Sequence, residues 1–185
     1  TFEPVLNKLG MPGPAADSEE QHLRRASLIS LLGINADSPD VQRRARELAE
    51  GYLANPASLP GTLVQTALRV AAVGGNAALY DRYKARMQQV TSDPEEFYRF
   101  FNSLTYFRDP ALITRTLEFA ISEDVRSQDT STLFQGVMER QPGRDLGWAF
   151  VKASWDRIVK KLGTFQCLPN VVGSIGGACP TATAA

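Results

Sequence analysis

Residues 93–117 read DPEEFYRFFNSLTYFRDPALITRTL and contain two helix starts with one strongly aromatic helix between them. At each start an aspartate stands directly before a proline, first at Asp93–Pro94 and again at Asp109–Pro110. The aspartate side chain can cap free backbone amides, and proline fits the first helical position because its missing N–H has no partner to lose. The stretch therefore predicts two consecutive helices joined by a short turn.

Apolar side chains between these starts recur at the three- and four-residue spacing of one helix face. Because this is the spacing of a packed core, we interpret the stripe as packing rather than as a ligand cage. Glu95 and Glu96 precede the stripe in the first helical turn, where carboxylates favour the helix dipole, so we interpret them as capping residues and not as a catalytic acid–base pair. The stripe consists of Phe97, Phe100, Phe101, Leu104 and Phe107.

The helical spacing continues through most of the chain, and no segment of useful length alternates as a half-buried strand would. Ser38, Asn76, Asp109 and Gly143 mark successive starts that lie 38, 33 and 34 positions apart, with a pair of antiparallel helices in each interval. This is the period of a helical solenoid, in which each pair buries its apolar face only by stacking on its neighbours. A curved stack of this kind offers a binding surface.

The predicted fold is therefore all-α, a right-handed stack of antiparallel helix pairs of the HEAT or armadillo type (an α-solenoid) with about eight or nine helices. We assign residues 1–163 to the helical repeats. Residues 164–185 form a partial last repeat and a low-complexity tail, which a truncation of the stack would explain.

The composition excludes several classes of function. Twenty Lys and Arg balance twenty Asp and Glu, so no general field steers the chain to nucleic acid or to an anionic membrane. The single histidine, His22, cannot supply the paired ligands of a catalytic zinc site, and Cys167 with Cys179 does not complete a four-ligand cluster. We therefore predict no metal site, no cofactor and no catalytic residue in this chain, and no nucleic-acid partner.

The ends of the chain carry no targeting or membrane signal. Residues 1–10 lack a basic region followed by an apolar stretch, so no signal peptide is expected. The uncharged run 162–185 is interrupted by glycines and prolines and is not a membrane span. A cytoplasmic location is favoured, with an exported parent protein as the alternative, in which case Cys167 and Cys179 could form a disulfide.

Three polar features have structural interpretations beside functional ones. Arg43, Arg44 and Arg46 lie near acids at helical spacing, which favours a solvated helix face over a phosphate patch. His22 stands in a polar stretch and is interpreted as a surface residue. The segment Val125–Asp129 is a compact charged and amide set in which Asp129 can cap a helix and Arg126 can bridge repeats or contact a peptide.

Several segments, taken in order, resemble the C-terminal helical domain of the zinc aminopeptidases that carry HExxH and GAMEN motifs, a group that includes the puromycin-sensitive and endoplasmic-reticulum aminopeptidases. The resemblance covers most of the chain. The matching segments are Leu9–Gly10, Leu23–Arg24 through Leu32–Gly33, Phe107–Leu112, Val125–Asp129, and Gly143–Arg144 with Trp148 and Trp155.

The resemblance implies a non-catalytic domain fragment that covers a thermolysin-like catalytic domain and helps to enclose and bind the peptide substrate. The zinc and the aminopeptidase activity would belong to the parent polypeptide, because this chain has neither HExxH nor GAMEN. The implied partners are the catalytic domain of that polypeptide and the peptide. The candidate residues for contact with either partner are Arg108, Arg126, Gln128 and Asp129. The alternative interpretation is that these four residues have a purely structural role.

Two further expectations concern assembly. A last repeat without its neighbour exposes an apolar face, so Trp155, Val171 and Val172 are expected to support dimer contacts or to belong to a poorly ordered tail. The competing function is a free-standing helical-repeat scaffold that binds a protein or peptide on its concave face. An HExxH-bearing domain upstream in the same polypeptide distinguishes the aminopeptidase hypothesis from the scaffold.

Overall fold

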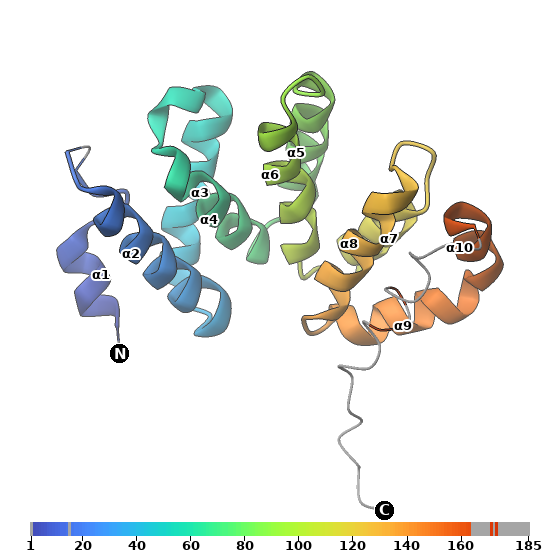
Figure 1. Ribbon diagram of the computed structural model, residues 1–185. Coiled ribbons are helices and arrows are strands. Elements are labelled where there is room, and N and C mark those ends of the chain that lie inside the picture. Colours follow the sequence, from blue (N-terminus) through green and yellow to red (C-terminus); the bar gives the residue numbers. More distant parts are fainter. Residues whose placement is uncertain (1, 15, 164–170, 172, 174–185) are drawn as a thin grey trace, which may run out of the picture. The chain divides into compact units, whose positions relative to one another are not determined.

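The computed structural model describes residues 2–14, 16–163, 171 and 173 (Figure 1). Over these residues the chain forms ten α-helices, one π-helix and two short 3-10 helices, with no strand. The all-α prediction is confirmed, and the helix count is slightly above the eight or nine predicted. The right-handed HEAT-like stacking stays a prediction. The chain divides into two compact units, Thr1–Phe107 and Arg108–Ala185.

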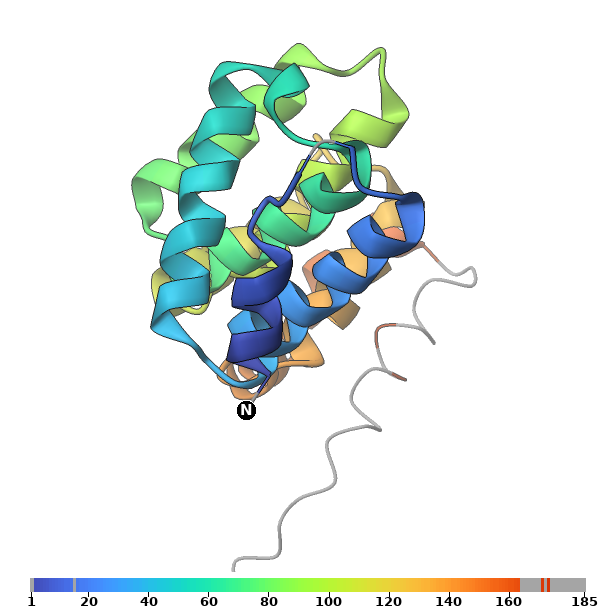
Figure 2. The ribbon, with the colours of Figure 1, turned by 90° about the vertical axis from the view of Figure 1, so that its left-hand side faces the viewer.

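The first unit is organised around one central helix, α4 (Gly61–Val73). It packs on α2, α3 and α6, and α6 packs in turn on α5 (Figure 2). Eight of its thirteen residues are buried because neighbours cover it on several sides. The remaining elements of the unit are α1 (Glu3–Leu9), α2 (Glu19–Ser30), the π-helix η1 (Leu31–Asn35), α3 (Pro39–Ala54), η2 (Pro56–Ser58), α5 (Ala77–Gln89), α6 (Pro94–Ser103) and η3 (Leu104–Tyr106).

The predicted helix starts at Ser38, Asn76, Asp93 and Asp109 are confirmed, and three of these four residues cap their helix with the side chain. The side chain of Asn76 accepts a hydrogen bond from the amide of Leu79 at 3.1 Å, and Asp93 accepts one from Glu96 at 3.1 Å. Ser38 stands before α3 but its hydroxyl caps no amide, and instead it donates to Glu3 Oε1 at 2.8 Å. The hydroxyl therefore connects the start of α3 to α1.

Most of the predicted aromatic stripe is buried in the core of the first unit, but its last members, Leu104 and Phe107, lie beyond the end of α6. Phe100, Phe101 and Phe107 are buried, whereas Phe97 is only half-buried. The ring of Tyr83 from α5 meets Phe100 and Phe107 edge-on, with centroids 5.3 and 5.8 Å away. Its hydroxyl donates to the carbonyl oxygen of Leu68 at 2.9 Å, and burial raises the pKa of Tyr83.

The second unit consists of α7 (Pro110–Ala120), α8 (Ser127–Met138), α9 (Gly143–Ala153) and α10 (Trp155–Leu162). Helix α7 packs on α8 and α9, and α8 also packs on α10. Gly147 of α9 lies so close to α8 that a Cβ there would stand 2.6 Å from Met138 Cγ. Arg157 donates two hydrogen bonds to Glu118, at 3.1 and 2.7 Å, and so joins α10 to α7.

The expected exposed apolar face of the last repeat is present only in part. Trp155 is 41% exposed, but Val171 is fully buried and is not available for a dimer contact. Val172, Cys167 and Cys179 lie outside the described residues. A dimer through Trp155 stays a prediction.

Candidate functional site

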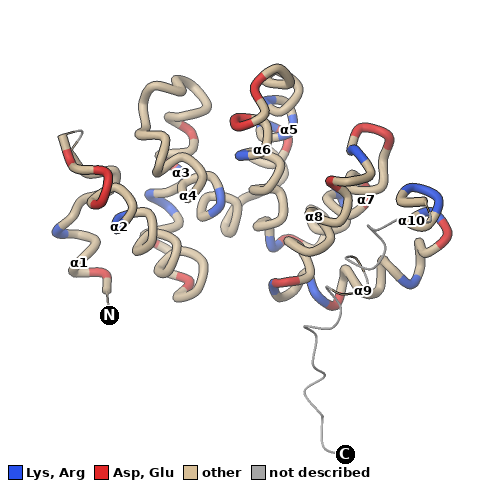
Figure 3. The backbone as a smooth tube through the Cα atoms, in the orientation of Figure 1, with Lys and Arg blue, Asp and Glu red and all other residues tan. Residues whose placement is uncertain are grey.

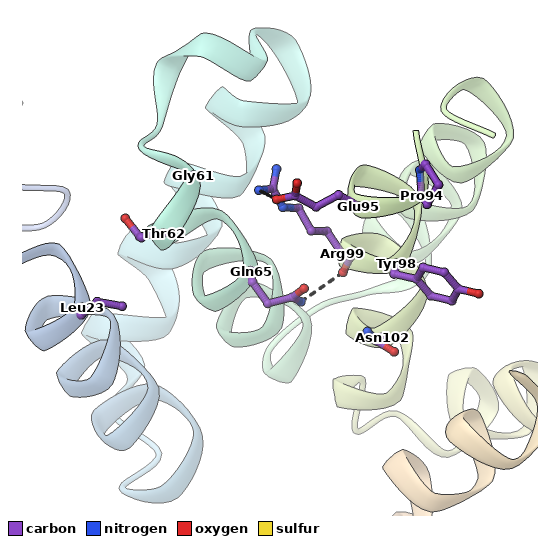
Figure 4. A pocket seen from close by; sticks show the side chains of 9 residues that line it. All are labelled: Leu23, Gly61, Thr62, Gln65, Pro94, Glu95, Tyr98, Arg99 and Asn102. Carbon is purple, nitrogen blue, oxygen red and sulfur yellow. Dashed lines mark hydrogen bonds and ion pairs between the residues drawn. The ribbon is translucent and has the colours of Figure 1, made fainter. Parts of the chain in front are cut away.

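The first unit contains an open pocket between α2, α4 and α6, with a volume of about 530 Å³ (Figure 4). Sequence reasoning missed this pocket, because its polar residues come from three helices and form no motif. The residues that line it are Leu23, Gly61, Thr62, Gln65, Pro94, Glu95, Tyr98, Arg99 and Asn102.

Gln65 fixes one side of the pocket. Its side-chain nitrogen donates to the carbonyl oxygen of Arg99 and to the hydroxyl of Ser103, both at 3.1 Å. These bonds connect α4 to α6 and hold the two pocket walls at a set distance. Gln65 is thus a positioning residue for Arg99, whose backbone it binds.

Among the described residues that line the pocket, Arg99 is the only cation. Its Nη1 lies 3.2 Å from Glu96 Oε2 and 3.3 Å from the hydroxyl of Tyr52, while Nη2 donates to Glu95 Oε1 at 2.5 Å. Desolvation alone would lower the pKa of Arg99, but the hydrogen bonds with Tyr52 and Glu96 and the charge of Glu95 outweigh it and raise that pKa. The guanidinium is charged and held from two sides.

Glu96 has a different role from the one predicted. Its backbone amide is capped by Asp93, but its side chain does not interact with the helix start and is buried, facing α3 and α5. The carboxylate accepts a hydrogen bond from Tyr52 of α3, and its other oxygen lies 3.7 Å from Nε of Arg86 on α5. Glu96 therefore connects three helices. Burial, and then the hydrogen bond to this carboxylate, raise the pKa of Tyr52 to about 12.

His22 is also placed differently from the prediction, which put it on the surface. It is buried, and its Nδ1 lies 3.2 Å from Nη1 of Arg25. Arg25 is itself fully buried, so every part of its guanidinium needs a partner inside the protein. Its other partners are the carbonyl oxygens of Leu9 and Gly10 and the carboxylate of Asp17. His22 is buried because it is one of the partners of Arg25.

The four predicted contact residues do not form one site. Arg126 and Gln128 are exposed at the start of α8, and Asp129 is half-buried in its first turn, whereas Arg108 directly precedes α7. Thr130 of α8 donates to the carbonyl oxygen of Ala120 at the end of α7, so the start of α8 packs against the end of α7. Arg108 therefore lies at the opposite end of α7 from the start of α8. The eleven residues of α7 separate the two ends by about 16 Å.

The predicted cap at Asp129 is wrong by three residues. Helix α8 begins at Ser127 with Arg126 as its N-cap, and the amide of Asp129 donates to the carbonyl oxygen of Arg126 at 2.9 Å. Ser127 also donates its hydroxyl to the carbonyl oxygen of Lys161 on α10, at 3.0 Å.

Of the three arginines of α3, Arg43 lies on a solvated helix face, as predicted. Arg44 and Arg46 are instead half-buried and donate to residues outside α3, Arg44 to Asn7 Oδ1 at 3.0 Å and Arg46 to Asn76 Oδ1 at 3.1 Å. Arg43 donates to Asp40 and to Glu47, each at 2.6 Å, and all three side chains are exposed. The hydrogen bond from Arg43 lowers the pKa of Asp40. Basic and acidic positions are interspersed along both units rather than separated by sign (Figure 3).

The described residues hold neither a cluster of metal ligands nor a membrane-spanning helix. They include no group of three His, Cys, Asp or Glu side chains that could hold a metal ion. No helix among them is long and apolar enough to cross a membrane. The pocket walls offer amide, hydroxyl, guanidinium and carboxylate groups.

These features define an all-helical domain with a polar pocket. The chain belongs to the family of the ERAP1-like C-terminal domain, whose model matches residues 1–184. Its relatives are aminopeptidases. The chain is 30% identical over 160 residues to "Aminopeptidase 2, mitochondrial" of Saccharomyces cerevisiae. The aligned region covers 85% of this chain and 16% of the yeast protein.

Two further relatives cover a similar share. "Aminopeptidase M1" of Arabidopsis thaliana is 23% identical over 94% of this chain and 20% of its own length. "Endoplasmic reticulum aminopeptidase 1" of Rattus norvegicus is 26% identical over 85% of this chain and 17% of its own length. The chain thus spans a fifth or less of each of these relatives.

Proposed function

We propose that this chain is the non-catalytic C-terminal part of a zinc aminopeptidase that removes N-terminal amino acids from peptides. In this role it covers the catalytic domain and helps to enclose and bind the peptide substrate. The family match over residues 1–184 carries the proposal, because it aligns nearly the whole chain with a domain of aminopeptidases.

The zinc of the proposed parent enzyme must be held elsewhere in that polypeptide. The described residues offer no three-ligand group, and the whole chain has only one histidine, which binds Arg25. A catalytic zinc site needs three protein ligands and an open position for water. The contribution of this chain to the reaction is therefore binding and enclosure.

The exposed polar residues are suited to contacts with a peptide or with a catalytic domain. Arg126 and Gln128 are exposed at the start of α8, and a guanidinium at such a position can pair with a carboxylate. Arg108 is half-buried at the start of the second unit and is suited to a separate contact. The pocket beside Arg99 supplies a third polar surface.

The proposal is tested in the parent polypeptide with the substitutions Arg108→Ala and Arg126→Ala. Two substrates are compared, a chromogenic single-residue amide and a peptide of about ten residues. Loss of this domain's contacts should raise the KM for the long peptide severalfold and leave the small amide unchanged, because only the long peptide reaches beyond the zinc site. Arg43→Gln, on the solvated face of α3, is the control. Equal kinetics of all variants on both substrates would contradict a role in peptide binding.

A further inference from the structure

The segment Leu23–Leu28 reads LRRASL and places two arginines directly upstream of the dipeptide that ends in a serine, with a leucine after it. Serine kinases choose their substrates by charge pattern, and an arginine pair on this side of a serine suits a kinase whose substrate groove is acidic. Such a groove binds its substrate as an extended segment. The segment therefore has the features of a phosphorylation site at Ser27.

The folded protein exposes the serine but only part of the charge pattern. Ser27 and Arg24 lie on the outer face of α2, and the hydroxyl of Ser27 donates to the carbonyl oxygen of Leu23 at 3.0 Å. Arg25, by contrast, is fully buried. Because consecutive helical residues point about 100° apart, one groove cannot take both arginines while α2 is folded.

The segment that precedes α2 encloses Arg25. Its guanidinium donates to the carbonyl oxygens of Leu9 and Gly10, at 2.9 and 3.0 Å, and to the carboxylate of Asp17. Gly13 lies against the same guanidinium with a φ of +85°, and a Cβ placed there would overlap it. The end of α1 and the residues up to Asp17 therefore hold Arg25 inside the protein.

The complete charge pattern becomes accessible only when α2 leaves its neighbours. Helix α2 packs on α4, buries Ala26 and Ile29, and lies beside α1 (Figure 2). Helix α4 begins at Gly61, so a growing chain contains Leu23–Leu28 before it contains the helix that covers this segment. A kinase can thus bind the segment in a chain that has not yet folded or that opens locally.

We propose that Ser27 is a phosphorylation site of an arginine-directed serine kinase, and that folding of the first unit closes this site. The co-substrate is ATP. A bond forms between the Ser27 Oγ and the γ-phosphorus, the bond from that phosphorus to the β-phosphate oxygen breaks, ADP leaves, and the hydroxyl proton passes to an aspartate of the kinase.

A chain phosphorylated in this way can still fold. Ser27 lies on the outer face of α2, where a phosphate displaces no packed side chain, and exposed Arg24 stands one helical turn before it and can pair with the phosphate. The phosphate then records that the segment was open to a kinase. This proposal does not rest on the proposed aminopeptidase function.

The test incubates the 185-residue chain with Mg²⁺, ATP and the purified catalytic subunit of a cyclic-AMP-regulated serine kinase. Mass spectrometry measures the initial rate of phosphate incorporation at Ser27. A peptide of residues 19–33 is the open reference, and its Ser27→Ala form is the blank. We expect rapid phosphorylation of the peptide and a rate at least about a hundredfold lower for the chain, because only its opened fraction reacts.

Three glycine variants of the chain connect this rate to the enclosure of Arg25. Gly13→Ala should raise the rate at least about fivefold, because alanine is strained at this φ and its Cβ overlaps the guanidinium. Gly51→Ala, whose Cβ would meet only Ser58 Oγ at 3.7 Å, is the benign control and should not raise it. Gly147→Ala disturbs the packing of α9 on α8 in the second unit and should leave the rate unchanged, which separates local opening from general loss of stability.

Three results would overturn the proposal. Absence of phosphate on the peptide would refute the site, and equal rates for the peptide and the chain would refute its closure by folding. Equal rates for Gly13→Ala and Gly147→Ala would refute the role of the segment that encloses Arg25. None of these measurements depends on peptidase activity, so their failure is distinguishable from failure of the proposed function.

Discussion

The Nε of Arg25 donates a hydrogen bond to the carbonyl oxygen of Gly10 at 3.0 Å, across fifteen positions of sequence. With its further bonds to Leu9 and Asp17, this one side chain ties α2 to the end of α1 and to the segment that follows. Both residues fall in the segments that resemble the aminopeptidase domain.

Replacing Arg25 by Met should lower the free energy of unfolding by about 3 kcal/mol, because Asp17 and two carbonyl groups lose their partner. Denaturant unfolding followed by circular dichroism measures the change. Arg24→Met on the exposed side of α2 is the matched control and should change stability by less than about 0.5 kcal/mol. Equal effects of the two substitutions would show that the buried network contributes nothing.

The raised pKa of Tyr52 predicts a loss of stability at alkaline pH. The raised pKa keeps this hydroxyl neutral in the folded protein up to about pH 12, whereas the tyrosine of an unfolded chain ionises near its ordinary pKa of 10. Stability from this group is therefore complete below pH 10 and is lost as the pH rises towards 12. Tyr52→Phe should flatten this part of the stability–pH curve, measured by denaturant unfolding. Tyr106→Phe, a half-buried tyrosine of η3, provides the comparison, and an unchanged slope in Tyr52→Phe would refute the assignment.

Gly147→Ala should destabilise the second unit by about 1–3 kcal/mol, because its Cβ would stand 2.6 Å from Met138 Cγ and force α8 and α9 apart. The control is Gly51→Ala in α3, where the nearest atom to a Cβ is Ser58 Oγ at 3.7 Å. That substitution should stabilise the chain by about 0.5–1 kcal/mol, because alanine has the higher helix propensity. Thermal unfolding should thus shift in opposite directions for the two variants, and a common direction would contradict the packing described for α8 and α9.

Local sequence rules predicted the helices well, and long-range polar contacts poorly. The starts at Asn76, Asp93 and Asp109 follow from caps and prolines, which act within three or four residues. Glu96 was misjudged because its partner Tyr52 is 44 positions away, and proximity along the helix suggested a cap instead. The residues next to Glu96 in the sequence do not indicate that its carboxylate is buried.

The same reason explains the missed pocket and the misplaced histidine. Gln65 and Arg99 meet only because α4 and α6 pack side by side, 34 positions apart in sequence. His22 lies inside because Arg25 is fully buried, although both stand in a polar stretch. The predicted contacts Arg108 and Arg126 came from matching segments rather than from geometry, and the helix pair separates them.

The central claim is that this chain is part of an aminopeptidase, and the mass of the native protein tests it most directly. An antibody against this domain isolates the protein from its source, and mass spectrometry gives the intact mass and a peptide map. We predict a polypeptide several times heavier than 20.2 kDa with an HExxH-containing peptide upstream of this domain. A native product near 20.2 kDa would contradict the account and favour a free-standing scaffold.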